Sequence, residues 1–98
     1  MFDPQAGHEQ SGRRPALVLT PRVYNEKAGL AVTCPITSRV KGYPFEIPVV
    51  SPRVQGVVLA DQIRSMDWRV RQFTLIERAH ADLVQAVQQA LGALLRIG

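Results

Sequence analysis

The chain has 98 residues, of which 46% are hydrophobic; this excludes an intrinsically disordered chain and predicts a single globular domain over residues 1–98. Twelve lysines and arginines stand against eight aspartates and glutamates, and the resulting formal charge of +4 is compatible with a polyanionic partner. A single cysteine, Cys34, excludes an intrachain disulfide framework, and no apolar run has the length of a membrane helix.

The first part of the chain alternates polar loops with two apolar stretches. Residues 1–15 are polar and contain glycine, proline and charged side chains, which predicts a loop region. A short buried strand is predicted over residues 15–20, and a polar turn over residues 22–29 follows it. The next apolar run predicts a second strand over residues 30–37, in which Pro35 marks a bulge or a sheet edge.

The middle of the chain continues this pattern of short strands. A polar, basic loop over residues 38–44 leads to a third strand over residues 45–50, where apolar residues alternate. Another apolar run predicts a fourth strand over residues 56–63. Residues 66–76 alternate weakly and predict a fifth strand or two shorter ones.

The end of the chain changes from a strand period to a helix period. An amphipathic helix is predicted over residues 80–97, because the apolar side chains there fall on one face at helical spacing. Short strands over residues 15–76 followed by one helix predict a mainly β domain with a C-terminal α-helix, a small bent sheet or barrel capped by that helix. The apolar positions of the helix are Leu83, Val84, Val87, Leu91, Leu94 and Leu95.

Glu9 and Arg14 lie five residues apart in a glycine-flanked loop just before the first predicted strand. Glycine lets the backbone come close to a ligand. The guanidinium of Arg14 suits phosphate oxygens, and the carboxylate of Glu9 can move a proton. The loop therefore suggests phosphodiester chemistry, and the alternative is a solvated turn with a weak ion pair.

A second polar patch follows the second predicted strand. Hydroxyls and cations at the end of a strand fit phosphate oxygens, and strand ends of one sheet often meet at one rim. The alternative is an ordinary solvated turn. The patch comprises Thr37, Ser38, Arg39 and Lys41.

Asp61 and Gln62 form a polar pair that follows an apolar strand, so they are either a structural hydrogen-bonding pair or part of a site. Tyr43, Phe45 and Trp68 are able to stack on unpaired bases, and their alternative role is to pack in the core or at a dimer contact.

Metal-ligating and cofactor motifs are not found in the sequence. His8 and His80 are far apart, and there is no Cys-x-x-Cys or His-Glu-x-x-His spacing, so neither a metal site nor a cofactor is predicted. A nuclease without a metal ion would use the 2′-hydroxyl of RNA as its nucleophile, which favours single-stranded RNA as substrate. No leader pattern is visible, so a cytoplasmic protein without a membrane partner is expected.

Blocks of sequence along nearly the whole chain resemble the MazF/PemK family of toxin endoribonucleases, with the MazF branch the more similar. Each block is weak by itself, but they occur in the order and spacing of the family. The blocks are Glu9-Gln10-x-Gly12-x-Arg14-Pro15, Cys34-Pro35-Ile36-Thr37, Lys41-Gly42-Tyr43-Pro44-Phe45-Glu46, Gly56-Val57-Val58-Leu59-Ala60-Asp61-Gln62-Ile63-Arg64-Ser65 and Trp68-Arg69.

The resemblance implies an SH3-like small β-barrel of the type shared by MazF, PemK and CcdB, acting as a homodimer. It implies metal-independent cleavage of single-stranded mRNA at short sequences, with 2′,3′-cyclic phosphate and 5′-hydroxyl products, and consequent inhibition of translation and growth. It also implies a MazE-like acidic antitoxin as partner.

The resemblance assigns roles to individual residues. Glu9 is either the base that activates the 2′-hydroxyl or a group that positions the substrate. Arg14 is the general acid and charge stabiliser, and Thr37 is the contact to the scissile phosphate. Asp61 matches an aspartate that some PemK-like members use for proton transfer, although Leu59 replaces the arginine that accompanies it there. The implied hydrogen-bonding and RNA-binding residues are Gln62, Gln10, Gly12, Arg13, Ser38, Arg39, Lys41, Tyr43, Phe45 and Arg64.

One departure from the family pattern concerns its first strand, of which only Phe2-Asp3-Pro4 is recognisable. Either the recorded start lies too far along the chain or the barrel is open along one edge.

Two other functions fit the same fold: a catalytically inactive RNA- or protein-binding barrel, and a CcdB-like toxin directed at gyrase.

Overall fold

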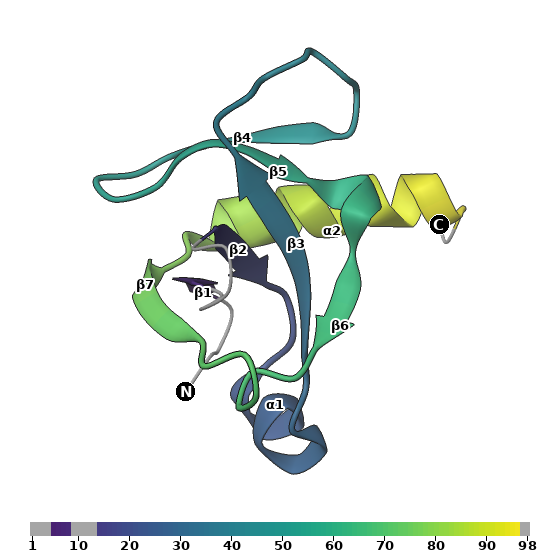
Figure 1. Cartoon of the computed structure of the whole chain (residues 1–98). Helices are drawn as coiled ribbons and strands as arrows, with labels where there is room; N and C mark the ends of the chain where they lie inside the picture. Colours follow the sequence, from purple (N-terminus) through teal and green to yellow (C-terminus); the bar gives the residue numbers. More distant parts are fainter. Residues whose placement is uncertain (1–4, 9–13, 97–98) are drawn as a thin grey trace.

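The computed structural model describes residues 5–8 and 14–96 of the chain. Figure 1 shows a curved sheet with a long helix running across one of its faces. The mainly β architecture with a C-terminal helix is therefore confirmed. The elements in chain order are β1 (Gln5–His8), β2 (Pro15–Val18), α1 (Arg22–Ala28), β3 (Ala31–Thr37), β4 (Glu46–Val50), β5 (Gln55–Leu59), the 3-10 helix η1 (Ala60–Gln62), β6 (Arg64–Met66), β7 (Thr74–Arg78) and α2 (Ala81–Leu95).

The strands form one antiparallel sheet in the order β4-β5-β3-β2-β1-β7, with β6 paired to β3 beside this path. Within the described residues the two end strands, β4 and β7, do not pair, so the sheet is strongly curved but not closed. The small barrel-like fold expected from the sequence is thus present with an open edge. Residues 2–4, the remnant of the family's first strand, lie outside the described residues.

Strand β3 organises the sheet because it has partners along both edges. On one edge it pairs with β2, and on the other its first half pairs with β6 and its last two residues with β5. Cys34 and Pro35 lie between these two ladders, where η1 interrupts the partner strand. Pro35 is therefore central rather than at a bulge or an edge as predicted, and its missing N–H falls where the ladder is broken.

The core lies between the sheet and α2. Leu17, Cys34 and Val58 are fully buried and pack with Val87, which projects from α2. Burying such side chains contributes roughly 1.5–3 kcal/mol each, which fixes the helix on this face of the sheet. The predicted helix is confirmed, and it starts where His80 accepts a hydrogen bond at Nδ1 from the backbone N–H of Asp82.

Two segments predicted as loop or turn have regular structure. The predicted turn over residues 22–29 is α1, which ends at Gly29 in the left-handed region (φ 71°). The buried side chain of Asn25 joins α1 to Thr20 by two hydrogen bonds. Asn25 Oδ1 accepts from Thr20 Oγ1 at 2.6 Å, and Asn25 Nδ2 donates to the backbone carbonyl of Thr20 at 3.1 Å. These side-chain bonds stabilise a helix that polar composition alone does not indicate. Within the predicted loop 1–15, residues 5–8 form β1 because neighbouring strands β2 and β7 supply partners on both sides.

Two further strand predictions need adjustment. The single strand predicted over residues 56–63 is β5 followed by η1, so the polar end of that run turns out of the sheet. Of the alternatives for residues 66–76, two short strands are correct, β6 and β7, with a turn between them. This turn closes through backbone bonds from Arg71 to Asp67 and from Phe73 to Trp68.

Candidate functional site

A polar cleft of about 590 Å³ lies where the end of β3 meets the start of β2, both ends of β5 and the end of η1. It combines two guanidinium groups, two hydroxyls and two side-chain amides. These groups come from segments far apart in the sequence, which the sheet brings together at one rim. The lining residues are Arg14, Pro15, Pro35, Ile36, Thr37, Ser38, Arg39, Gln55, Leu59 and Gln62.

Arg14 and Thr37 face each other across neighbouring strands. The β2–β3 register pairs Ala16 with Pro35, so continuing it by two residues places Arg14 opposite Thr37. Arg14 is exposed and Thr37 is half-buried, and both line the cleft. A permanent cation beside a hydroxyl is a suitable arrangement for the oxygens of one phosphate group.

The hydroxyl of Thr37 is oriented by the chain that follows it. The backbone N–H of Arg39 donates to Thr37 Oγ1 at 3.1 Å, which forms a tight turn at the end of β3. Because Oγ1 accepts this bond, its own proton is left to be donated to a ligand oxygen. The same turn places Ser38 and Arg39 in the wall of the cleft.

Gly56 allows β5 to lie directly against the end of β3. Its φ is +136°, and a Cβ at this position would come within 2.2 Å of the carbonyl oxygen of Thr37. No role was predicted for Gly56, although an isolated glycine in a strand pattern is a signal of close backbone approach. Gln55, which precedes it in the cleft wall, was missed as well.

The loop after β3 is held by Glu46 at the start of β4. Its carboxylate accepts from the backbone N–H of Lys41 at 3.2 Å and from that of Gly42 at 2.9 Å. The rings of Tyr43 and Phe45 are 5.6 Å apart, and Phe45 packs against the core. Tyr43 is the more accessible of the two aromatic side chains, with 51% of its surface exposed. Lys41, Tyr43 and Phe45 do not line the cleft.

Asp61 and Arg64 lie apart from this cleft. Asp61 is in η1, and its negative charge acts on the thiol of Cys34. The pKa of Cys34 rises from 9.0 to about 11, mainly because the thiol is buried and to a smaller extent because of the charge of Asp61. Buried and protonated, Cys34 is a core residue, and its Sγ contacts the carbonyl of Ala60 at 3.9 Å. Arg64 pairs with Thr33, toward the other end of β3. Gln62 is the member of the Asp61–Gln62 pair that lines the cleft.

The remaining predicted residues are also accounted for. Glu9, Gln10, Gly12 and Arg13 lie outside the described residues. Trp68 is half-buried, and its indole Nε1 donates to the carbonyl of Asn25 at 2.9 Å, which indicates a structural role instead of base stacking.

Across residues 5–8 and 14–96, no group of three or more His, Cys, Asp or Glu side chains is arranged to hold a metal ion. In the same ranges, neither helix has the length and apolar character needed to cross a bilayer.

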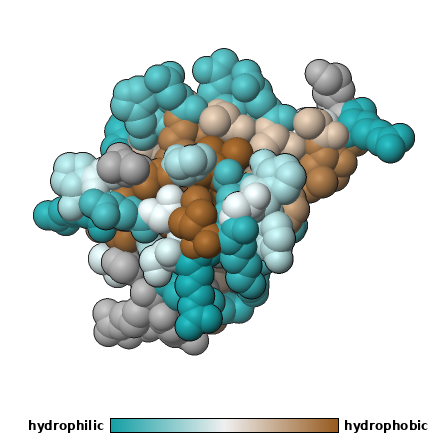
Figure 2. All heavy atoms as spheres, turned by 90° about the horizontal axis from the view of Figure 1, so that it is seen from above, coloured by the Kyte–Doolittle hydropathy of each residue, from teal (hydrophilic) through white to brown (hydrophobic). Residues whose placement is uncertain are grey.

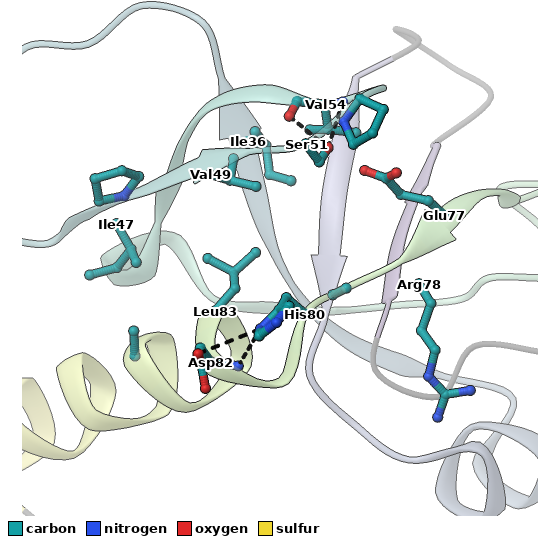
Figure 3. Close-up of a pocket in the computed structure, with 14 residues that line it drawn as sticks. Ile36, Ile47, Val49, Ser51, Val54, Glu77, Arg78, His80, Asp82 and Leu83 are labelled. Carbon is teal, nitrogen blue, oxygen red and sulfur yellow. Dashed lines mark hydrogen bonds and ion pairs between the residues drawn. The ribbon is translucent and has the colours of Figure 1, made fainter.

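A second pocket, of about 670 Å³, opens between β4, the end of β7 and the start of α2. Figure 3 shows Ile47, Val49 and Leu83 around its apolar interior, with the bond between His80 and Asp82 at its rim. The surface seen from above in Figure 2 shows hydrophobic residues gathered together and bordered by hydrophilic ones. No site was predicted in this region, whose lining combines an apolar interior with the polar side chains of Ser51, Glu77, Arg78, His80 and Asp82.

The fold and the polar cleft define a small basic β-protein whose cleft is lined by guanidinium, hydroxyl and amide groups. A family model described as PemK-like, MazF-like toxin of type II toxin-antitoxin system matches residues 1–95. The endoribonuclease toxin MazF of Escherichia coli (strain K12) is 40% identical over 94 residues, which cover 96% of this chain and 85% of that protein. The chain belongs to the PemK/MazF family, and it is a MazF-like endoribonuclease toxin of a type II toxin-antitoxin system.

Solved structures agree with this assignment. A crystal structure of MazE-MazF from Deinococcus radiodurans (Form-III) matches with a TM-score of 0.91 and 45% identity, covering 98% of this chain and 96% of that chain. MazF from the same organism (Form-I) matches with a TM-score of 0.83 and 55% identity, covering 98% and 88%. The family, fold and endoribonuclease class predicted from the sequence are therefore confirmed.

Proposed function

We propose that the polar cleft binds single-stranded RNA and that Arg14 and Thr37 hold the phosphate at which the strand is cut. The observation that carries this proposal is the placement of Arg14 opposite Thr37 at one rim of the sheet. Ser38 and Arg39 extend the same polar wall and are suited to a neighbouring phosphate. This arrangement favours a ribonuclease over an inactive binding barrel or a gyrase-directed toxin.

The proposed reaction is an internal transfer within the RNA. The 2′-oxygen attacks phosphorus, its proton passes to a base, and the bond from phosphorus to the 5′-oxygen breaks. The 5′-oxygen takes up a proton from Arg14, the proposed general acid, so the products are a 2′,3′-cyclic phosphate and a 5′-hydroxyl. Arg14 stabilises the negative charge that builds up on the phosphate oxygens, and Thr37 donates a hydrogen bond to one of them. The carboxylate of Glu9 is the proposed base.

This reaction requires no bound metal, because the nucleophile belongs to the substrate and the positive charge comes from arginine. We propose that the enzyme acts on mRNA at short sequences in the cytoplasm and so inhibits translation and growth. Lys41 and Tyr43, both exposed in the loop after β3, are the proposed contacts to RNA outside the cleft.

A MazE-like acidic antitoxin is the proposed protein partner, and the proposed active form is a homodimer. Deinococcus radiodurans MazF crystallises with MazE in structures that match this chain closely, which supports such a partner here. The net positive charge of this chain suits an acidic polypeptide as well as RNA.

The test is cleavage of single-stranded RNA in the presence of EDTA, with the ends of the products analysed by mass spectrometry. Wild type should yield cyclic phosphate ends, whereas Arg14→Ala should be at least about a hundredfold slower. Arg22→Ala is a charge-matched control, because Arg22 is exposed at the start of α1 and outside the cleft. Intact RNA with folded wild type, or equal rates for Arg14→Ala and Arg22→Ala, would contradict the proposal.

A further inference from the structure

We propose that Gln55 and Gln62 read the base next to the scissile phosphate, and that these two amides determine part of the sequence specificity. The inference rests on the proposed ribonuclease function and assigns a base-reading part to the same cleft. Neither residue carries the chemistry of cleavage; both select which RNA is cut.

The two amides flank the strand that lies beside Thr37. Thr37 pairs with Val57, and alternation along β5 puts Gln55 and Leu59 on the same face as this pair. Gln62 follows at the end of η1. Gln55, Leu59 and Gln62 all line the cleft that holds Thr37, so the two amides lie on the β5 side of Thr37 while Arg14 lies on the β2 side.

The close contact between β5 and β3 sets how near Gln55 comes to the phosphate site. There is no space for a Cβ atom between Gly56 and the carbonyl of Thr37. The backbone next to Gln55 therefore contacts the end of β3 directly. A residue with a side chain at position 56 would force the strands apart. The glycine thus lets the start of β5, which carries Gln55, lie directly against the end of β3, which carries Thr37.

Both amides are available to a ligand. Gln55 and Gln62 are exposed, and within the described parts of the chain no hydrogen bond engages either side-chain amide. Each amide offers one acceptor oxygen and two donor hydrogens. The cations of the cleft, Arg14 and Arg39, suit phosphates, so the amides are left as the neutral groups that pair with a base edge.

An unpaired base is well suited to this part of the cleft. Its edge presents a donor and an acceptor side by side, which a glutamine amide matches with two hydrogen bonds. The half-buried Leu59 offers apolar surface between the two amides for the face of the base. A matched pair of bonds of this kind changes the preference between bases by about tenfold or more.

The experiment cuts an RNA pool with a randomised segment and sequences the 5′ ends of the fragments. With wild type, one position at a fixed distance from the cut should show a strong base preference. Gln55→Ala and Gln62→Ala should each weaken preference at a position adjacent to the cut by about tenfold. Gln55→Glu, which removes the donors, should shift preference toward bases that present an amino group.

Gln88→Ala is the matched control. Gln88 is an exposed glutamine on α2 and does not line the cleft, so this variant should keep the wild-type cut pattern. Circular dichroism and the chemistry of the product ends show that each variant is folded and cuts by the same route. Where an alanine variant fails to fold, Gln55→Asn and Gln62→Asn take its place, and the shortened side chains should weaken the same preference.

The outcomes separate the two proposals. If folded wild type leaves RNA intact, the proposed function is wrong and this inference is overturned with it. If wild type cuts and the Gln55 and Gln62 variants keep the full base preference at every position near the cut, only the base-reading inference is overturned. A loss of preference confined to the positions adjacent to the cut supports it.

Discussion

Arg14 lies opposite Thr37 at one rim of the sheet, although 22 residues, with β2 and α1 among them, separate the two along the chain. The pairing of β2 with β3 produces this relationship, so the sheet fixes the two backbone positions that carry the guanidinium and the hydroxyl. A site built on strand ends holds its groups in place before a ligand arrives, which favours catalysis by preorganised charge.

The shape of the Arg14 side chain should matter in addition to its charge. Arg14→Lys keeps one positive charge but loses the planar fork that binds two phosphate oxygens. We expect kcat/KM for RNA cleavage to fall at least tenfold, and Arg14→Ala to cost about 3 kcal/mol of transition-state stabilisation. Steady-state cleavage of a short fluorescent RNA measures both values, and a fully active lysine variant would show that charge alone suffices.

The glycine next to the cleft should tolerate no side chain. A Cβ at Gly56 would meet the Thr37 carbonyl oxygen at 2.2 Å, and φ is +136° there, so Gly56→Ala should cost roughly 1–3 kcal/mol in free energy of unfolding. Gly42→Ala is the control: its φ is also positive, at +82°, but no atom lies within 4 Å of its Cβ. Urea unfolding should rank Gly56→Ala as clearly the less stable variant; equal stabilities would contradict the close contact.

The carboxylate of Glu46 should protect the loop that follows β3. Because it accepts from the N–H groups of Lys41 and Gly42, Glu46→Ala should speed hydrogen exchange of these two amides by about tenfold. Glu26→Ala, on α1, removes the same charge elsewhere and should leave both amides unchanged. Unaltered exchange in Glu46→Ala would show that the loop is held by other contacts.

The buried thiol should make stability fall at high pH. The pKa of Cys34 rises from 9.0 to about 11 in the folded chain, chiefly by burial and then by the charge of Asp61. The folded state therefore holds this proton more tightly, so the stability contribution is complete below pH 9 and is lost as pH rises to about 11. Urea titrations should show a smaller loss over this range for Cys34→Ala than for wild type, whereas parallel curves would contradict the assignment.

Much of the fold could be predicted from periodicity and composition. The helical spacing of Val84, Val87 and Leu91 identified α2, because an amphipathic stripe is a direct consequence of packing on a sheet. The helix α1 could not be predicted in this way, since it depends on bonds between Asn25 and Thr20 that only the folded chain assembles. Strand β1 likewise depends on the partners that β2 and β7 provide.

The polar cleft was predictable in part, because residues at the ends of neighbouring strands meet at one rim of a sheet. Polar residues at strand ends, such as Thr37 and Arg39, were expected to meet at one rim, and they line one cleft with Arg14. The contribution of Gln55 depends on strand register, which the sequence alone did not supply. Asp61 and Arg64 do not line the cleft, because Asp61 lies in η1, which follows β5, and Arg64 lies in β6, where it pairs with Thr33 toward the other end of β3.

The most direct measurement is a double-mutant cycle on kcat/KM with Arg14→Ala, Thr37→Val and the double variant. If both side chains hold the same phosphate, removal of one weakens what the other contributes, so we expect a coupling free energy of about 1–3 kcal/mol. Independent effects, with the loss in the double variant equal to the product of the two single losses, would show that Arg14 and Thr37 do not act on one phosphate.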